Sequence, residues 1–480
     1  MVSRAAGPDF GGIRAEFELP VRFPESVLDE AARAVAAGPL GDRVDATDLP
    51  LVTVDPPGAK DLDQAMLVTR SGDEFVVHYA IADLGAFVPP GGALDREVRR
   101  RGQTLYLPDG NVPLHPTVLS EGAASLLPDQ VRPAALWTLR CSADGELTSA
   151  HVRRALVRSR ERLDYETVRA MVDGGTVHPS LAALPALGRL RREHAVARGA
   201  VELALPDQEV EPDGRGGWRL TLRPRSEVDA WNAEVSLLTG MAAASMMLSA
   251  GVGVLRTLPA AQDGAVRWLR RSAHSLGIEW PRSVDVAELL SGLDPSRPEA
   301  LALFMDATRL LRGAAYTAFD GAEPELSTHA GLAAEYAHVT APLRRLVDRY
   351  GTEVCLALCA DEPVPAWVRE ALPELPGVMA ASDALAGRVE RACLDQVEAW
   401  VLAERVGQEF DAVVLRAEGA SAEVFVPDPP VIAKCANEDP VGDLPDDLPE
   451  GGTVRVRLVR ADAKARKVTF ERVKEASFRE

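Results

Sequence analysis

The pattern of predicted secondary structure changes at Gly407, and this change constrains the fold more than any other sequence feature. Before Gly407, a few apolar strands are mixed with long helical stretches. After it, the pattern predicts only short strands, at 409–416, 421–426, 430–435, 453–460 and 466–472. Five short strands within about 70 residues are typical of a small closed barrel such as an OB-fold. We therefore expect an α+β protein whose C-terminal part is a β-barrel.

The remaining sequence divides into a short N-terminal segment and one large domain. A chain of 480 residues is longer than one ordinary domain. Residues 1–45 hold a single helical pattern, from Glu25 to Ala36, which Gly38 ends. This is too little for an independent domain. We expect an N-terminal segment at 1–45, a large domain at 46–404 and the barrel domain at 405–480.

Within the large domain, apolar and β-branched runs predict strands, and 3.6-residue periodicity predicts helices. Strands are expected at 50–54, 74–81, 134–141 and 147–157. Helices are expected at 93–101, 163–200, 227–249, 262–276, 296–315, 342–360 and 376–405.

Composition excludes several classes of protein. No run of about 18 apolar residues is present, which predicts no membrane span, and the N-terminus has no secretory pattern. The five cysteines are scattered, so neither a disulfide framework nor a zinc site is expected. We expect a cytoplasmic protein. The net charge of -19 argues against non-specific coating of nucleic acid, but it leaves room for a locally basic channel.

The sharpest chemical feature is an acidic loop that follows the strand at 50–54. Asp55 ends this strand, Pro-Pro-Gly breaks it, and Asp61 and Asp63 follow. Alternate residues of an extended segment point to one face, so Asp61 and Asp63 are expected to lie on the same side. Three carboxylates that converge repel one another unless a cation lies between them. Hard oxygen ligands of this kind suit Mg²⁺.

Other readings of this loop are possible. An EF-hand would need glycine where Met66 stands, so the standard calcium loop is excluded. A solvated turn rich in aspartate fits the loop alone equally well. The sequence has no GxxxxGK[ST] phosphate loop, so ATP-driven chemistry is not predicted.

The segment from Thr53 to Ala65, TVDPPGAKDLDQA, resembles the active-site loop of the RNase II/RNase R (RNB) exoribonucleases. Further blocks of similarity follow in the same order. They are YAIAD at 79–83, RGQTLYLP at 101–108, LSEGAASL at 119–126 and HAGLAAEYAHVTAPLRRLVD at 329–348. The resemblance covers roughly residues 48–400. Several separated motifs in the right order are more specific than any one of them.

The resemblance implies an RNB catalytic domain, which is a mixed sheet surrounded by helices with a central RNA channel, followed by an OB-fold. It implies hydrolysis of single-stranded RNA from the 3′ end to nucleoside 5′-monophosphates. The cofactor would be Mg²⁺, with Mn²⁺ as the alternative, as one or two ions. By position, Asp55, Asp61 and Asp63 match three of the four active-site aspartates and would be catalytic metal ligands. Gln64 stands at the fourth position, near the substrate.

The same resemblance assigns four more residues to the site. Tyr106 matches the aromatic residue that stacks on the 3′-terminal base. Arg344 matches the arginine that contacts the terminal phosphates as part of the catalytic set, and Arg345 completes the pair. Arginine suits this role because its planar fork binds phosphate at two points. Glu234 matches a glutamate near the leaving nucleotide, although a solvent-facing helix glutamate is an equal alternative.

The C-terminal barrel resembles the OB-fold RNA-binding module of the family. OB barrels hold single strands by stacking and by a basic groove. The candidates here are Phe425, Phe470, Arg455, Arg457, Lys464 and Lys467. The cold-shock domains that usually precede the catalytic region are not expected in this chain. With fewer OB-folds, weak affinity for short RNA and strong dependence on salt are expected.

Two other functions stay open at this point. Gln64 is neutral and a poorer Mg²⁺ ligand than carboxylate, so the chain could be a degenerate RNA-binding or regulatory protein. A phosphodiesterase for a substrate other than RNA would need an open pocket, and the barrel pattern argues against it.

Overall fold

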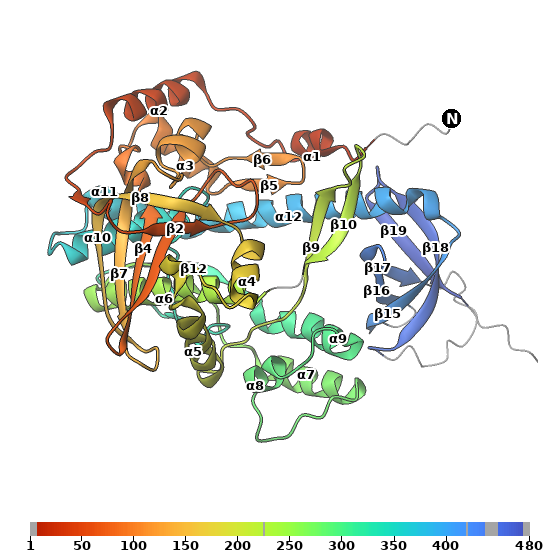
Figure 1. Ribbon diagram of the computed structural model, residues 1–480. Coiled ribbons are helices and arrows are strands. Elements are labelled where there is room, and N and C mark those ends of the chain that lie inside the picture. The colour runs from red at the N-terminus through yellow and green to blue at the C-terminus, as the bar shows by residue number, and fades with distance from the viewer. Residues whose placement is uncertain (1–6, 224–225, 419–420, 437–449, 474–480) are drawn as a thin grey trace, which may run out of the picture.

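The structure is a computed structural model that describes residues 7–223, 226–418, 421–436 and 450–473. Figure 1 shows a curved sheet with its helices on one side of the molecule and a small barrel on the other. The long helix α12 (Leu375–Leu402) runs between the two parts. The expected α+β architecture, with a mixed sheet followed by a five-stranded barrel, is confirmed.

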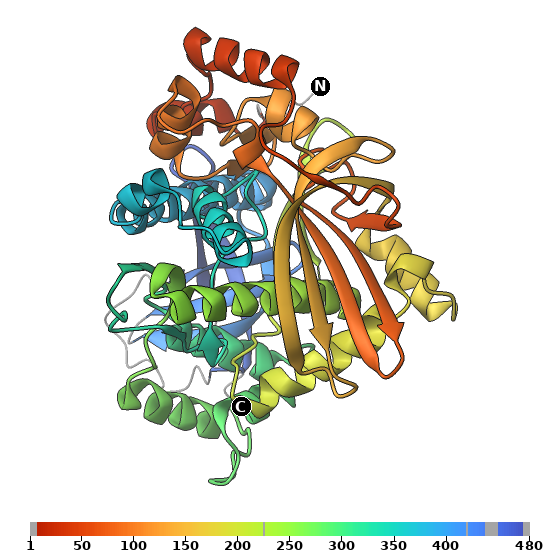
Figure 2. The ribbon, with the colours of Figure 1, turned by 90° about the vertical axis from the view of Figure 1, so that its left-hand side faces the viewer.

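The main sheet has six strands in the order β1-β8-β2-β3-β4-β7. They are β1 (Val44–Asp45), β2 (Leu51–Val54), β3 (Gln64–Ser71), β4 (Glu74–Ala82), β7 (Val131–Cys141) and β8 (Leu147–Leu163). The long strand β8 pairs antiparallel with β7 and parallel with β1 and β2. Because β8 pairs with β2 and also with β7, the sheet closes on itself. The sheet is strongly curved in Figure 2. β2 pairs antiparallel with β3, which places the end of β2 and the start of β3 side by side.

The helices that pack on this sheet include α6 (Glu227–Ala250) and α10 (Leu346–Cys359). A capping box between Ser226 and Asp229 starts α6, and Gly251 ends it in the left-handed conformation. Within the described residues, α6 is the one helix whose length and hydropathy would match a membrane span. Half of that stretch is buried inside the protein, so α6 is part of the core.

The motif blocks between the sheet strands form short elements. They are the turn η1 (Leu84–Ala86), α3 (Ala93–Arg101), the hairpin β5 (Leu105–Leu107) and β6 (Gly110–Val112), and the π-helical turn η2 (Leu119–Ala123). Before the sheet come α1 (Phe10–Glu16) and α2 (Glu25–Ala37). α2 and α3 have the predicted positions, but α1 was not predicted. It packs against α12 through Phe10 and Ile13 rather than forming a unit of its own.

Some predicted helices have different limits. The stretch 163–200 is divided by Gly174 and Gly175 into α4 (Tyr165–Asp173), the turn η3 (Pro179–Leu181) and α5 (Leu184–Ala197). The stretch 296–315 ends early, as α9 (Pro298–Ala307) and the turn η4 (Thr308–Leu311). The helix expected from residue 342 begins at Leu346, because residues 340–345 form a loop. After α10, α11 (Ala366–Ala371) leads into α12, and the turn η5 (Ala403–Arg405) follows it.

Strand β3 and the hairpin of β5 and β6 were not predicted, and neither were three further pairs of strands. These pairs are the hairpin β9 (Asp207–Pro212) and β10 (Trp218–Arg223), the pair β11 (Val252–Thr257) and β12 (Ala315–Asp320), and the pair β13 (Thr328–His329) and β14 (Ala334–Glu335). Between β11 and β12 the chain forms three helices: α7 (Asp263–Ser275), α8 (Val286–Ser291) and α9. We call residues 263–311 the helical insert. Its apolar side chains share one core with the barrel residues Val413, Leu415 and Phe425.

The C-terminal barrel is closed in the order β15-β16-β17-β19-β18. Its strands are β15 (Glu409–Glu418), β16 (Ser421–Pro427), β17 (Pro430–Ala436), β18 (Thr453–Asp462) and β19 (Lys467–Arg472). The sequence between β17 and β18, from Asn437 to Gly451, is acidic and rich in proline and lies largely outside the described residues. Phe470 is 0% exposed and packs edge-on against Phe410, and Phe425 is also buried. These two aromatic candidates for RNA stacking are therefore core residues.

A polar contact joins the barrel to α12 and to β9. The Gln208 Nε2 donates to Glu398 Oε1 at 3.0 Å and to the Pro430 carbonyl at 2.7 Å. Glu398 is buried, and burial, together with the nearby charge of Asp395, raises its pKa to about 7. The charged form of Glu398 is therefore unfavourable in the folded protein.

We expect Glu398→Gln to stabilise the protein at pH 8 and to have little effect near pH 4.5. The folded state binds this proton more tightly than the unfolded state, so the native glutamate loses stability as pH rises from its ordinary pKa to about 7. The amide keeps the acceptor for Gln208, and the gain is at most about 3 kcal/mol. Thermal unfolding at the two pH values measures it. Glu390→Gln, exposed on the same helix, is the control. An equal effect at both pH values would contradict the prediction.

Candidate active site

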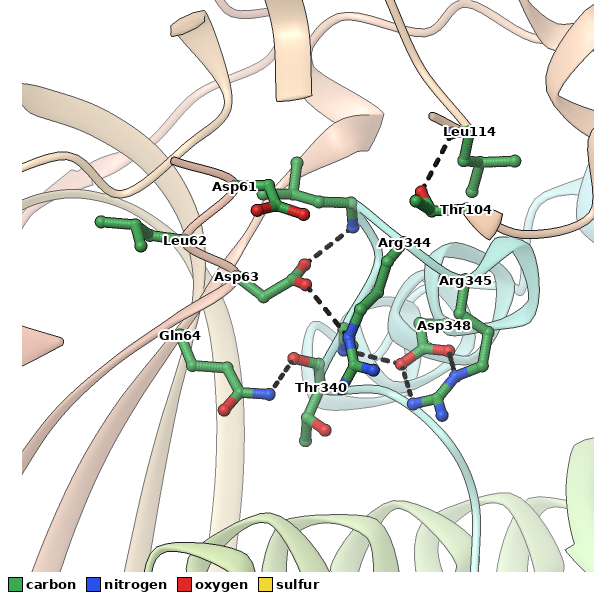
Figure 3. A network of polar contacts seen from close by, with 12 residues as sticks. Asp61, Leu62, Asp63, Gln64, Thr104, Leu114, Thr340, Arg344, Arg345 and Asp348 are labelled. Carbon is green, nitrogen blue, oxygen red and sulfur yellow. Dashed lines mark hydrogen bonds and ion pairs between the residues drawn. The ribbon is translucent and has the colours of Figure 1, made fainter. Parts of the chain in front are cut away.

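The acidic loop lies where β2 ends and β3 begins. Asp55 follows β2 directly, and its N–H donates to the Leu163 carbonyl at 3.1 Å. Leu62 is 0% exposed and holds the loop against the core. Figure 3 shows the side chains of Asp61 and Asp63 on the side opposite to Leu62, as the alternation of an extended segment requires.

Ser125 fixes the backbone of this loop. Its hydroxyl accepts from the Leu62 N–H at 3.0 Å and donates to the Lys60 carbonyl at 2.6 Å. The Leu126 N–H donates to the Leu62 carbonyl at 3.0 Å. The block at 119–126 therefore serves to position the residues between Asp55 and Asp63.

Asp63 faces the late block of the sequence. Its Oδ1 accepts from the Leu343 N–H at 2.7 Å, and its Oδ2 lies 3.7 Å from the Arg344 Nε (Figure 3). Asp63 is 6% exposed. Burial raises its pKa well above the ordinary value, while the charge of Arg344 opposes that rise. The side chain is therefore suited to accept a proton.

Asp55 carries an unsatisfied acceptor. Burial, and then the charge of Asp61, raise the pKa of Asp55 to about 6. Its Oδ2 is buried without a hydrogen-bond partner. A buried carboxylate oxygen of this kind, with a second carboxylate nearby, fits a cation.

The structure differs from the expectation that three carboxylates converge on one metal. No group of three or more His, Cys, Asp or Glu side chains is arranged to hold a metal within the described residues. The reason is that Asp63 turns toward Leu343 and Arg344. Mg²⁺ often takes only one or two carboxylates, with water and substrate oxygens completing its shell. Asp55 and Asp61 fit this smaller set.

Tyr106 and Arg344 are brought together by backbone pairing of two distant segments. The Thr104 N–H donates to the Arg344 carbonyl, and the Leu346 N–H donates to the Gly102 carbonyl, both at 3.0 Å. Tyr106 is 51% exposed, and its hydroxyl donates to Asp61 Oδ2 at 3.3 Å. The tyrosine ring is therefore free to contact a ligand beside the carboxylates.

A surface hollow of about 520 Å³ adjoins these residues. It is lined by Tyr106, Arg344 and Arg345 on one side and by residues of β9 and α12 on the other. β9 contributes the run from Gln208 to Glu211, which sequence reasoning missed. The turn DGRGG at 213–217 was the available indication, since Asp-Gly turns are typical of hairpins.

The two adjacent arginines have different surroundings. The Arg344 side chain is half exposed. The Arg345 side chain is mostly buried, and its Nη2 donates to Asp348 Oδ1 at 2.8 Å. Asp348 is 0% exposed and also accepts from the Ala341 N–H at 2.7 Å. Arg344 is thus available to an anion, whereas Arg345 is committed to the loop.

Gln64 is held by the protein at both ends of its amide. Its Nε2 donates to the Thr340 carbonyl and its Oε1 accepts from the Tyr79 hydroxyl, both at 2.7 Å. The Tyr79 hydroxyl also lies 2.7 Å from Ser236 Oγ on α6. The expected contact of Gln64 with substrate is therefore not what the structure shows. Gln64 braces the loop that carries Leu343 and Arg344.

We expect Gln64→Glu to destabilise the protein by about 1–3 kcal/mol, because the Thr340 carbonyl would lose its donor and face an oxygen atom. Urea unfolding of the variant and the native protein measures the loss. Asp73→Asn, on the exposed β3–β4 turn, serves as control. Undiminished stability combined with faster RNA hydrolysis would instead mean that the new carboxylate binds metal.

Glu234 does not lie at this site. It is buried on α6, and the charges that act on it belong to Arg191, Arg192, Arg198 and Glu202. The solvent-facing alternative is therefore wrong, and a role of Glu234 beside the leaving nucleotide stays a prediction. Ser236, two residues further along α6, is the one connected to the site. Residues two apart on a helix point in nearly opposite directions.

Comparison with known proteins agrees with this arrangement. Residues 43–354 match the family model described as the RNB domain. The chain belongs to the RNB family. Residues 408–473 of this RNB protein match the C-terminal S1 domain of RNase II-type exonucleases. Nucleases of the RNB family generally depend on divalent metal ions.

Relatives at the sequence level are named Ribonuclease R. The protein from Chlamydia trachomatis is 27% identical over 357 residues, which are 72% of this chain and 51% of that protein. The protein from Escherichia coli is 30% identical over 351 residues, which are 69% of this chain and 42% of that protein. This RNB protein therefore spans about half the length of the curated relatives it matches.

Solved structures show the same fold. RNase R from Mycoplasma genitalium has a TM-score of 0.86 at 18% identity, covering 97% of this chain and 78% of that one. It has also been solved with single-stranded RNA. Yeast Ssd1, described as a pseudonuclease, has a TM-score of 0.66 at 16% identity, covering 83% of this chain and 52% of that one.

Proposed function

We propose that this protein is a hydrolytic exoribonuclease that degrades single-stranded RNA from its 3′ end and releases nucleoside 5′-monophosphates. The observation that carries the proposal is the juxtaposition of Tyr106 and Arg344 with Asp61 and Asp63. An exposed aromatic ring, an available guanidinium and two carboxylates are the groups needed to hold the last nucleotide and cleave its phosphodiester. The relatives named Ribonuclease R support the same activity.

Each of these side chains has its own role in the proposed hydrolysis. Tyr106 stacks on the terminal base, which any base permits because all bases have a π-face. Arg344 binds the scissile phosphate. Asp63, with its raised pKa, takes the proton of the attacking water. Water attacks phosphorus, the bond from phosphorus to the 3′ oxygen breaks, and the released 3′ oxygen takes a proton from solvent to become the new 3′ hydroxyl, while Asp63 returns its proton to solvent.

The cation would be Mg²⁺, held by Asp55 and Asp61, with Mn²⁺ as a substitute. When bound, it supplies Lewis acidity and charge neutralisation at the phosphate. The unsatisfied Oδ2 of Asp55 supports this placement. Because Gln64 is bonded to the protein, one ion is favoured over two.

A circular RNA tests whether a free 3′ end is required. With Mg²⁺, a linear single strand should disappear and nucleoside 5′-monophosphates should accumulate, as measured by chromatography. The same sequence closed into a circle should stay intact. Degradation of the circle would mean internal cleavage and would overturn the proposal.

We expect Tyr106→Ala to raise KM by about 5- to 150-fold, since stacking contributes about 1–3 kcal/mol per base. Tyr106→Phe should stay close to the native value, because it keeps the ring and loses only the 3.3 Å contact with Asp61. Steady-state kinetics on a single-stranded RNA measures both. Equal KM values for the alanine and phenylalanine variants would contradict the stacking role.

The second candidate is a degenerate RNA-binding or regulatory protein. Two observations favour it: Gln64 is neutral and bonded away from the cation, and the same fold occurs in a pseudonuclease. Such a protein would bind RNA equally well with or without Mg²⁺ and would leave the linear strand intact.

A further inference from the structure

The helical insert carries several cationic side chains without a partner. Arg267 and Arg271 on α7, and Arg282 just beyond it, are all exposed. Over the part of the chain that the structure describes, none of the three forms an ion pair. In a protein with a net charge of -19, unpaired positive charge gathered on one surface indicates an anionic partner.

Aromatic side chains lie among these arginines. The Arg270 guanidinium lies 4.1 Å from the centre of the Trp280 ring, and the Arg309 guanidinium lies 4.0 Å from that of Trp268. The Trp280 Nε1 donates to the Val284 carbonyl at 2.9 Å, which fixes the ring. Arginine and aromatic rings together are the combination that single-stranded nucleic acid requires.

This surface is hollowed. A depression of about 1030 Å³ is lined by Arg270, His274, Gly277, Ile278, Glu279, Trp280 and Arg282. Glu279 is its one acidic lining residue. The site is therefore wide enough for an extended chain and is positive on balance.

On the barrel, by contrast, two of the candidate arginines are paired with acidic side chains. Arg455 Nη1 lies 2.7 Å from Asp411, and Arg457 Nη2 lies 2.9 Å from Glu409. Phe425 and Phe470 are buried, so Lys464 and Lys467, both exposed, are what remains of the expected RNA-binding face. The insert shares its core with the barrel, so the two parts lie side by side.

The insert is distant from the candidate active site. Figures 1 and 2 share their vertical axis, and in both α7 lies at the lower end of the molecule, while α2 and α3 lie at the upper end. β5, which carries Tyr106, is near the upper end in Figure 1. A short RNA held at Tyr106 therefore does not extend to α7, whereas a longer strand can.

We propose that the surface formed by Arg267, Arg270, Arg271, Trp280 and Arg282 binds the upstream part of a single-stranded RNA whose 3′ end is in the active site. The inference rests on the proposed function for the identity of the ligand. The guanidinium groups contact phosphates, and the Trp280–Arg270 stack contacts bases. The insert thereby adds a second binding surface to the one expected on the barrel.

The test is a binding measurement in EDTA, where cleavage does not interfere. The triple variant Arg267→Gln, Arg271→Gln, Arg282→Gln is compared with native protein by fluorescence anisotropy, using 5′-labelled single-stranded RNAs of about 24 and about 5 nucleotides. We expect the Kd for the long RNA to rise at least about tenfold. The slope of log Kd against log salt concentration should fall by about 2, which is about 0.7 for each lost phosphate contact. The Kd for the short RNA should stay unchanged.

The control variant carries the same charge change elsewhere: Arg22→Gln, Arg33→Gln, Arg70→Gln, all exposed residues. All six substituted positions are exposed, so folding should be retained, and circular dichroism checks it. Equal Kd values for the long RNA in the two triple variants would overturn the inference, as would equal weakening of long and short RNA. Because the assay involves no cleavage, failure of the nuclease activity would not affect its outcome.

Discussion

Replacement of Asp63 by Asn should lower kcat for RNA hydrolysis by at least about a hundredfold, the range expected when a proton acceptor is removed. The change removes the charge and basicity of a buried group and leaves its shape. Asn Oδ1 can still accept from the Leu343 N–H, which Asp63 binds at 2.7 Å. KM should therefore change little, since Tyr106 and Arg344 keep their positions.

The same substitution should leave thermal stability unchanged or raised. Burial raises the pKa of Asp63, so its charged form is unfavourable in the folded state and the neutral amide relieves that cost. Kinetics and thermal unfolding of one preparation measure both effects. Asp73→Asn, at an exposed position on the turn between β3 and β4, is the control. Loss of activity together with a large drop in Tm would mean that Asp63 is structural rather than catalytic.

Arg344 and Arg345 should respond in opposite ways to the same substitution. Arg345→Ala leaves Asp348 buried without its ion-pair partner, and breaking such a pair costs about 3–5 kcal/mol. Arg344→Ala removes a half-exposed side chain and should leave unfolding nearly unchanged. It should lower kcat about a hundredfold by removing a positive donor at the phosphate.

Urea unfolding and steady-state kinetics of the two variants, measured in parallel, separate these roles. Arg344→Lys should recover only part of the activity, because an ammonium group lacks the planar fork of arginine. A destabilised Arg344→Ala, or a stable and inactive Arg345→Ala, would reverse the assignment of the two residues.

The sequence predicted the parts of the fold that depend on local pattern. Continuous apolar runs gave β2 and β4, and the change of period at Gly407 gave all five barrel strands. The hairpin of β9 and β10 was missed because charged residues interrupt both strands and most of the strand residues are only half-buried. Contacts with α12 and the barrel, rather than an apolar face of its own, hold it in place.

The site was predictable as a set of residue types but not as a geometry. Strand alternation predicted that Asp61 and Asp63 share a face, but not that Asp63 turns toward Leu343 and Arg344. The role of Gln64 depends on Tyr79, Ser236 and Thr340, which come from three separate segments. The different surroundings of Arg344 and Arg345 depend on Asp348, since only the fold decides which arginine turns toward it.

The central claim is tested most directly with a single-stranded RNA labelled at its 5′ end, incubated with Mg²⁺ and resolved on a sequencing gel. Native protein and Asp63→Asn are run side by side, each with and without EDTA. The expected result is loss of full-length RNA to a very short labelled end product, seen only with native protein and Mg²⁺. Intact RNA in every lane, with binding retained in a parallel anisotropy measurement, would contradict the exoribonuclease and favour an RNA-binding protein.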